Sequence, residues 1–206
     1  MQSDAELLTA WRAGDTKAGN ELFRRHYGTV HRFLVNKVDN ELEDLLQRTF
    51  EACAEGRDRF EGRSSFRSYL LGIARNLVLQ HWDKRRRAPR SESVEDLAVH
   101  DLAAGPSTVL ARNASHRRLL EALRRIPLKY QIVLELYFWE ELTGPQLGEA
   151  LGILEDTARS RLRRAKLKLA GELNRLERSA SALESTSADL ERWAAGVRTQ
   201  LVDQLD

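Results

Sequence analysis

Apolar residues recur every three or four positions through most of the 206-residue chain, which places them on one face of a helix. In the first third of the chain this pattern covers residues 3–14, 17–38 and 42–53. Gly14-Asp15 and Asp39-Asn40 interrupt the pattern, because these residue types favour turns. The pattern therefore predicts three helices that share a core. The third helix carries acidic residues on its polar face, which is either a solvated face or a binding surface.

A polar segment at residues 57–65 separates these helices from a longer one. Gly62 and the two serines at 64 and 65 predict a loop, and either serine can cap a helix over residues 66–87. One side of that helix is apolar and the other is polar, with these residues on the polar side: Arg67, Arg75, Asn76, Gln80, His81, Lys84 and Arg85. Cations, amides and aromatic side chains on one helix suit nucleic acid. The alternative is a solvated face, with Trp82 in the core.

The composition changes between residues 88 and 111, where two prolines, several serines and an excess of acidic residues predict a linker. Helical spacing returns at residues 116–126, and Pro127 begins another helix rich in apolar residues. The linker therefore separates two helical domains.

Residues 142–168 read as two short helices joined by a tight turn. Thr143 can cap the first helix, Pro145 is tolerated in its first turn, and Gln146 stands three residues after the cap. Gly152 allows the chain to reverse, and the exposed side of the second helix is cationic. This pattern predicts a helix-turn-helix whose second helix fits a major groove about 12 Å wide. The alternative is a basic helix that is only solvated.

The overall charge of +2 hides two basic clusters, at residues 84–90 and 159–168. A single cysteine, Cys53, excludes an internal disulfide, and the five histidines do not have zinc-site spacing. No glycine-rich phosphate loop or nucleophile pattern is present, so we expect no enzyme activity, metal or cofactor. No run of eighteen apolar residues occurs, and the N-terminus does not read as a signal peptide. We therefore expect a cytoplasmic protein without membrane insertion.

Two stretches together resemble one family. NELEDLLQRTFEAC followed by DRFEGRSSFRSYLLGIARNLVLQHWDKRRR is similar to region 2 of bacterial sigma factors of the extracytoplasmic-function (ECF) group, and RIPLKYQIVLELYFWEELTGPQLGEALGILEDTARSRLRRAKLKL is similar to region 4. The resemblance implies an all-α protein of two small helical domains joined by an acidic flexible linker. The expected parts are region 2 at 1–87, the linker at 88–111, region 4 at 112–172 and a C-terminal helical extension at 173–206.

The resemblance also implies partners and sites. The partners are promoter DNA and core RNA polymerase, contacted at the β′ clamp and the β flap. Many ECF factors are also held inactive by an anti-sigma factor. The implied polymerase-binding residues are Glu43, Asp44, Gln47 and Phe50. The implied minus-10 residues are Phe60, Arg63, Ser64, Ser65, Asn76, Gln80, Trp82, Lys84 and Arg85, with the loop at 60–65 as a pocket for a flipped base. The implied minus-35 residues are Thr157, Arg159, Ser160, Arg161 and Arg164.

The sequence departs from the family pattern at several positions. Arg48 stands where an acidic residue is usual, and Leu154 stands where proline is frequent. Residues 144–148 replace a more typical aromatic, acidic, Ile-Ala pattern. Two other functions stay open on sequence alone: a helix-turn-helix regulator that acts without polymerase, and an adaptor that no longer reads DNA.

Beyond residue 172 the chain predicts an amphipathic helical extension. Leu176, Leu183, Leu190 and Val197 recur every seven residues, although so short a heptad run does not establish a coiled coil. The apolar stripe would pack on the protein's own domains, on a second copy or on a regulator.

Overall fold

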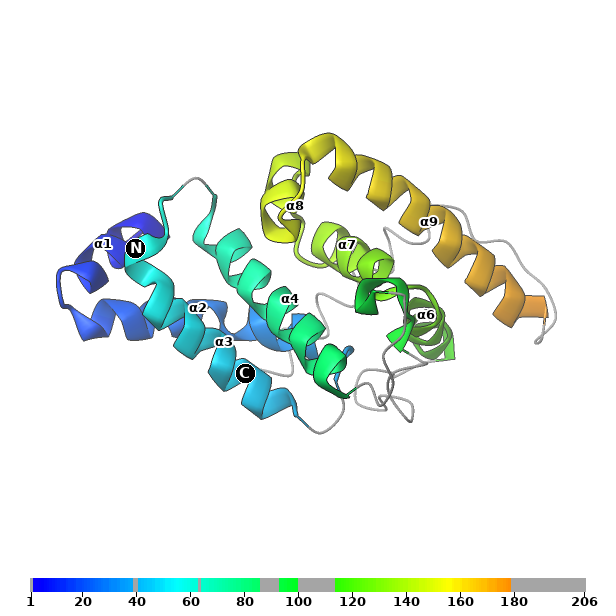
Figure 1. Cartoon of the computed structure of the whole chain (residues 1–206), viewed down its shortest axis with the longest axis horizontal. Helices are drawn as coiled ribbons and strands as arrows, with labels where there is room; N and C mark the ends of the chain where they lie inside the picture. Colours follow the sequence, from blue (N-terminus) through cyan, green and yellow to red (C-terminus); the bar gives the residue numbers. More distant parts are fainter. Residues whose placement is uncertain (1, 39–40, 63, 86–92, 100–113, 179–206) are drawn as a thin grey trace.

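The computed structural model describes residues 2–38, 41–62, 64–85, 93–99 and 114–178 (Figure 1). The helices are α1 (Asp4–Arg12), α2 (Thr16–Val35), α3 (Leu42–Gly56), α4 (Phe66–Arg85), α6 (Ala114–Arg125), α7 (Leu128–Phe138), α8 (Gly144–Leu151) and α9 (Glu155–Arg178). Two 3₁₀ turns, η1 (Arg57–Arg59) and η2 (Val94–Asp96), lie between them. Over these ranges the only β-type pairing is an isolated bridge between Ala98 and Pro127, so the all-α prediction is confirmed. Much of the linker and the heptad beyond Leu176 lie outside the described residues.

Helices α1 to α4 form the N-terminal lobe. The first helix begins in a capping box, because Ser3 N donates to the Glu6 carboxylate at 2.7 Å and Glu6 N donates to Ser3 Oγ at 3.3 Å. Gly14 then adopts φ +101°, and Asp15 accepts from Lys17 N at 2.9 Å to begin α2. These local signals set the helix boundaries that the sequence predicted.

Helices α6 to α9 form the C-terminal lobe, with α7 at its centre. Leu128, Ile132, Val133 and Leu136 of α7 are fully buried, and α6, α8, α9 and η2 all pack against this helix. A helix that is apolar on all sides can be stable only inside a core. One carboxylate, Glu135, is also buried on α7.

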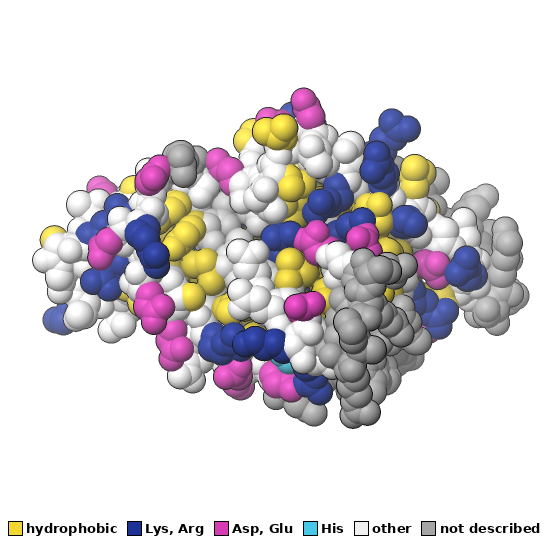
Figure 2. Space-filling model, viewed as in Figure 1, with side chains coloured by type: hydrophobic (Ala, Val, Ile, Leu, Met, Phe, Trp, Pro, Cys, Tyr) yellow, Lys and Arg dark blue, Asp and Glu magenta, His cyan; other side chains and the backbone are white. Residues whose placement is uncertain are grey.

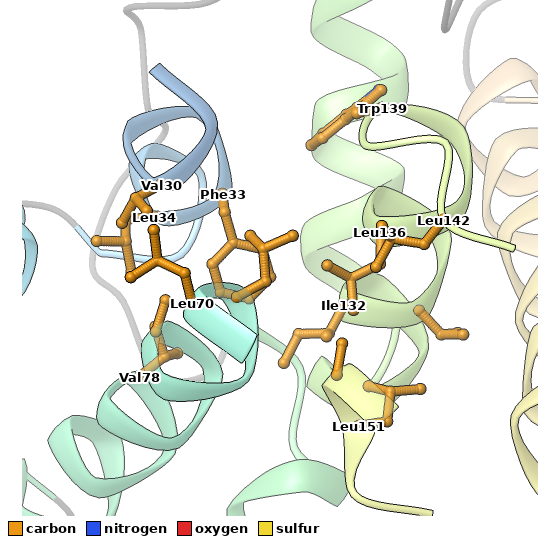
Figure 3. Packing of buried hydrophobic residues seen from close by; sticks show 14 of the residues in the cluster. Val30, Phe33, Leu34, Leu70, Val78, Ile132, Leu136, Trp139, Leu142 and Leu151 are labelled. Carbon is orange, nitrogen blue, oxygen red and sulfur yellow. The ribbon is translucent and has the colours of Figure 1, made fainter. Parts of the chain in front are cut away.

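The two lobes pack directly against each other and share one hydrophobic cluster. Figure 3 shows Phe33 of α2 and Leu70 of α4 across from Ile132 and Leu136 of α7. Helix α4 forms part of the N-terminal side of this interface, since it packs on α2 and α3 within its own lobe and on α8 of the other lobe (Figure 1). At this crossing an ideal Cβ on Gly72 would lie only 3.4 Å from the Ala150 carbonyl oxygen. The sequence did not predict this docking of the lobes.

A matched pair of leucine substitutions tests this core. Leu70 is 0% exposed, whereas Leu154 is 80% exposed. Leu70→Ala should lower the free energy of unfolding by about 2–5 kcal/mol through lost burial and a residual cavity. Leu154→Ala should change it by no more than about 0.5 kcal/mol. Urea denaturation followed by circular dichroism measures both, and equal losses would contradict the assignment of α4 to the core.

The single cysteine provides a second test of the N-terminal lobe. Cys53 is fully buried on α3, and burial raises the pKa of its thiol from 9.0 to about 12. Only the thiolate reacts quickly with alkylating reagents, so native protein should resist iodoacetamide at pH 8 while urea-unfolded protein reacts. Because the folded pKa is raised, this group's contribution to stability is complete below pH 9 and is lost as the pH rises toward 12. Rapid alkylation of native protein, measured by mass spectrometry, would contradict this burial.

Candidate polymerase and nucleic-acid surfaces

Helix α3 presents the predicted polymerase-binding residues on its outer face. Glu43, Asp44 and Gln47 are exposed, whereas Leu45 and Leu46 of the same turns are buried. The atypical Arg48 lies one turn after Asp44, and its Nη1 contacts the Asp44 carboxylate at 3.3 Å. The arginine therefore offsets part of the negative charge on this face.

An aromatic group borders the acidic face. Phe50 is half-buried and packs against Phe23, with ring centroids 4.8 Å apart, and it stacks almost parallel on Tyr27 at 6.4 Å. Tyr27 is one of the few large apolar side chains with a high exposure, 40%. The sequence analysis did not identify Tyr27, because this residue falls within the apolar pattern of residues 17–38.

The loop before α4 is held by contacts from α1 and from α4. The Arg12 guanidinium donates to the carbonyl oxygens of Arg57, at 2.9 Å from Nε, and of Phe60. Phe60 stacks on Tyr69 with 4.5 Å between ring centroids, and Gly62 adopts φ +71°. The loop therefore presents a half-buried aromatic ring beside a turn that glycine favours.

The hydroxyl groups of the loop have different roles. Ser65 Oγ accepts from Ser68 N at 3.0 Å and so caps α4, as the sequence predicted. Ser64 is half-exposed, and Arg63 lies outside the described residues.

The polar side of α4 carries the other predicted minus-10 residues. Asn76, Gln80 and Lys84 are four residues apart and exposed, so they form one row along the helix. Arg85 is also exposed and pairs with Glu41. Trp82 points the other way: it is 4% exposed, and its indole N–H donates to the Lys37 carbonyl at 3.0 Å. In this arrangement Trp82 orients the helix and is not available for stacking.

The helix-turn-helix forms as its sequence predicts. The Gln146 carboxamide oxygen accepts from Thr143 N at 2.9 Å, and α8 ends at Gly152, which adopts φ 66° and ψ 35°. Ile153 N then donates to the Gly148 carbonyl at 2.9 Å and closes the turn. The second helix, α9, begins at Glu155.

Helix α9 separates an apolar face from a polar one. Ala158, Ala165 and Leu169 are buried. Thr157, Ser160 and Arg164 are exposed at positions i, i+3 and i+7, which lie on one side of a helix. Arg161 beside them is half-buried, and Arg159 is exposed and pairs with Glu155, 2.8 Å from its Nε to the carboxylate. The five predicted residues are thus together at the start of α9, and three of them form an unobstructed row.

The distribution of charged side chains does not by itself mark the predicted polymerase-binding and DNA-binding surfaces. On the face in Figure 2, basic and acidic side chains are interspersed over both lobes. Within the described ranges no three His, Cys, Asp or Glu residues gather as metal ligands would. None of the helices described has the length and apolarity needed to cross a membrane.

A helix-turn-helix with a basic second helix, joined to another helical lobe, is typical of DNA-binding proteins. Comparison with family models matches residues 22–88 to sigma-70 region 2 and residues 116–169 to sigma-70 region 4. The chain therefore belongs to the sigma-70 family, in the ECF group that the sequence resembles. It is a transcription initiation factor that directs RNA polymerase to promoters, and this family is not one of enzymes.

Curated relatives align over most of the chain. RNA polymerase sigma factor CarQ of Myxococcus xanthus is 31% identical over 172 residues, which are 82% of this chain and 97% of the relative. ECF RNA polymerase sigma factor SigM of Mycobacterium tuberculosis is 29% identical over 171 residues, which are 82% of this chain and 84% of the relative.

Solved structures share the fold. CnrH in complex with the cytosolic domain of CnrY aligns with a TM-score of 0.60 and 21% identity, covering 84% of this chain and 98% of that one. The sigma factor RpoE of Bartonella quintana, in complex with the anti-sigma factor NepR, aligns with a TM-score of 0.58 and 20% identity. The alignment covers 75% of this chain and 96% of that one.

Two glycine substitutions test the geometry of the helix-turn-helix. A Cβ at Gly148 would lie 2.9 Å from the Ile153 carbonyl oxygen, whereas a Cβ at Gly171 would have no neighbour within 4 Å. Gly148→Ala should destabilise the protein by about 1–3 kcal/mol, because the backbone of the turn must shift. Gly171→Ala on α9 should stabilise it by up to about 1 kcal/mol through helix propensity. Thermal melts of both variants measure the effect, and a neutral Gly148→Ala would mean that the turn is looser than described.

Proposed function

We propose that the chain binds core RNA polymerase through the outer face of α3, opens the minus-10 element with the loop at 60–65 and α4, and reads the minus-35 element with α9. Three exposed surfaces of distinct chemistry, each in a region that matches the family, support this assignment. The observation that carries it is the row of Thr157, Ser160 and Arg164 directly after the helix-turn-helix turn.

The α3 surface suits a basic protein partner. Glu43 and Asp44 supply carboxylates and Gln47 an amide, so an arginine-rich coiled coil of the β′ clamp can pair with them. Phe50 and the neighbouring Tyr27 add apolar area next to the charges. An acidic rim beside an aromatic anchor is a common composition for a protein interface.

The loop at 60–65 and α4 suit a separated DNA strand. A base that leaves the duplex loses stacking worth a few kcal/mol, which a pocket with an aromatic wall offsets. Phe60 on Tyr69 provides that wall, and Ser64 provides a hydroxyl. The row of Asn76, Gln80 and Lys84 then offers amides to bases and a cation to phosphate.

The start of α9 suits intact duplex. Arg164 is exposed and can pair with the acceptor edge of a guanine, while Thr157 and Ser160 can contact bases or phosphates. Arg159 is held by Glu155 and would have to exchange that carboxylate for DNA. The β flap of the polymerase is the proposed second contact of the C-terminal lobe.

An anti-sigma factor and a cytoplasmic location belong to this proposal too. One structure of similar fold holds such a partner, because RpoE is bound to the anti-sigma factor NepR. In another, CnrH is bound to the cytosolic domain of CnrY. A protein that works with bacterial RNA polymerase on promoter DNA acts in the cytoplasm, because the bacterial genome lies there.

Run-off transcription tests the proposal directly. The chain is combined with bacterial core RNA polymerase and a pool of templates with randomised upstream sequence, and transcribed templates are sequenced. We expect enrichment of two short elements. Against the selected promoter, Arg164→Ala should reduce transcription roughly 5- to 150-fold, because a bidentate base contact is worth about 1–3 kcal/mol.

Two controls make the outcome specific. Arg175→Ala is the same change on the same helix, beyond the family match to region 4, and should leave transcription near wild type. Asp44→Lys should weaken binding to core polymerase, whereas Glu55→Lys, three turns further along α3, should not. Absence of any polymerase binding at low salt would refute the proposed function.

A further inference from the structure

An apolar side chain lies in water at the tip of the helix-turn-helix. Leu154, between the turn and α9, is 80% exposed, more than any other large apolar side chain in the part of the chain that the structure describes. The residue before it, Ile153, is half-buried and packs against the core. Leu154 itself buries little apolar area and so contributes little to folding.

The backbone at Leu154 is held from both sides. Ile153 N donates to the Gly148 carbonyl at 2.9 Å, and the Leu154 carbonyl accepts from Ala158 N at 3.0 Å. The second bond makes Leu154 the N-cap residue of α9. Serine, threonine, aspartate and asparagine are preferred at an N-cap, because their side chains accept from the free N–H groups of the first turn, and leucine cannot. Neither burial nor capping therefore accounts for leucine at this position.

Leu154 continues the surface that is proposed to read duplex DNA. It precedes Thr157 by three residues, so it extends the exposed row of Thr157, Ser160 and Arg164 by one turn toward the tip. In a helix-turn-helix the N-terminal residues of the second helix are the ones that contact base edges in the major groove. Leu154 is therefore at the end of α9 that comes nearest to the base pairs.

The charges around Leu154 favour a contact with bases over a contact with the DNA backbone. Glu155 and Asp156 follow Leu154 directly, and carboxylates repel phosphate groups. The cations of α9 come later, and the first of them, Arg159, is paired with Glu155 at 2.8 Å. Phosphates are therefore attracted further along the helix, while the tip offers an apolar side chain to the groove.

The group in the major groove that suits leucine is the C5-methyl of thymine, because the other bases present hydrogen-bond donors and acceptors there. A polar base edge covered by leucine would lose water without gaining a partner. We propose that Leu154 contacts a thymine methyl in the upstream promoter element and makes one position of that element selective for thymine. This inference rests on the proposed function, since it requires α9 in duplex DNA. It adds a specificity-determining residue at a position where the sequence departs from the family pattern.

Replacement of thymine by uracil tests the contact, because it removes only the methyl group and keeps the base pair. Promoters from the run-off selection are remade with deoxyuridine at each thymine of the upstream element in turn. They are transcribed by subsaturating core polymerase with wild type or Leu154→Ala. Burial of a methyl-sized group is worth about a fourfold change in binding. One replacement should lower wild-type transcription about fourfold and leave transcription by Leu154→Ala unchanged, as expected for two groups in contact.

Two further variants separate base reading from a structural role. Leu167→Ala removes the other exposed leucine of α9, which lies about 20 Å further along the helix and so outside a groove about 12 Å wide. This variant should keep the full sensitivity to uracil. Leu154→Ser supplies a capping hydroxyl, so it should raise the melting temperature and abolish the sensitivity. A purely structural role for Leu154 would move stability and selectivity in the same direction.

The outcomes separate this inference from the proposed function. Equal sensitivity to uracil in wild type and Leu154→Ala, or a selected upstream element without thymine on either strand, overturns the contact and leaves the proposed function intact. A uniform loss of transcription by Leu154→Ala, with the preference for thymine retained, assigns Leu154 to the DNA backbone and also overturns the contact. No transcription by the wild-type chain from any template refutes the proposed function, and this inference with it.

Discussion

The docking of the two lobes depends on how buried carboxylates are compensated. Glu135 and Glu140 lie in a core where an unpaired charge would cost several kcal/mol, so the N-terminal lobe must place a cation against each. That requirement fixes how α2 and α4 meet α7 more strictly than apolar contact does, because ion pairs and amide hydrogen bonds need defined distances and angles. The shared hydrophobic cluster holds the lobes together, and the charges set their register.

Local features of the fold could be predicted from sequence. The caps at Ser3, Ser65 and Thr143 and the turn at Gly152 each involve residues within a few positions of one another, so their signals are visible in the chain itself. The apolar run of α7 likewise indicated a central helix. The exposure of Ser160 and Arg164 followed from the same periodicity, because burial of Ala158 and Ala165 leaves these two residues outside.

The contacts between the lobes could not be predicted in this way. Arg32 and Glu140 are 108 residues apart, and Lys37 and Glu135 are 98 apart, so no periodicity links them. The same holds for Trp82, whose burial depends on a carbonyl group 45 residues away. One signal was present: Glu135 is a lone carboxylate within an apolar helix, and such a group must find a distant cation. Sequence alone does not identify which cation that is.

The length of α9 has a mechanical consequence. Its 24 residues form a rod of roughly 36 Å, with the exposed row on its first turns, and the helix packs on α6, α7 and α8. A tilt of about 10° around the middle of such a rod moves its tip by roughly 3 Å, close to the rise of one base pair. A displacement at the far end of α9 is therefore transmitted along the full length of the helix to the exposed row at its start.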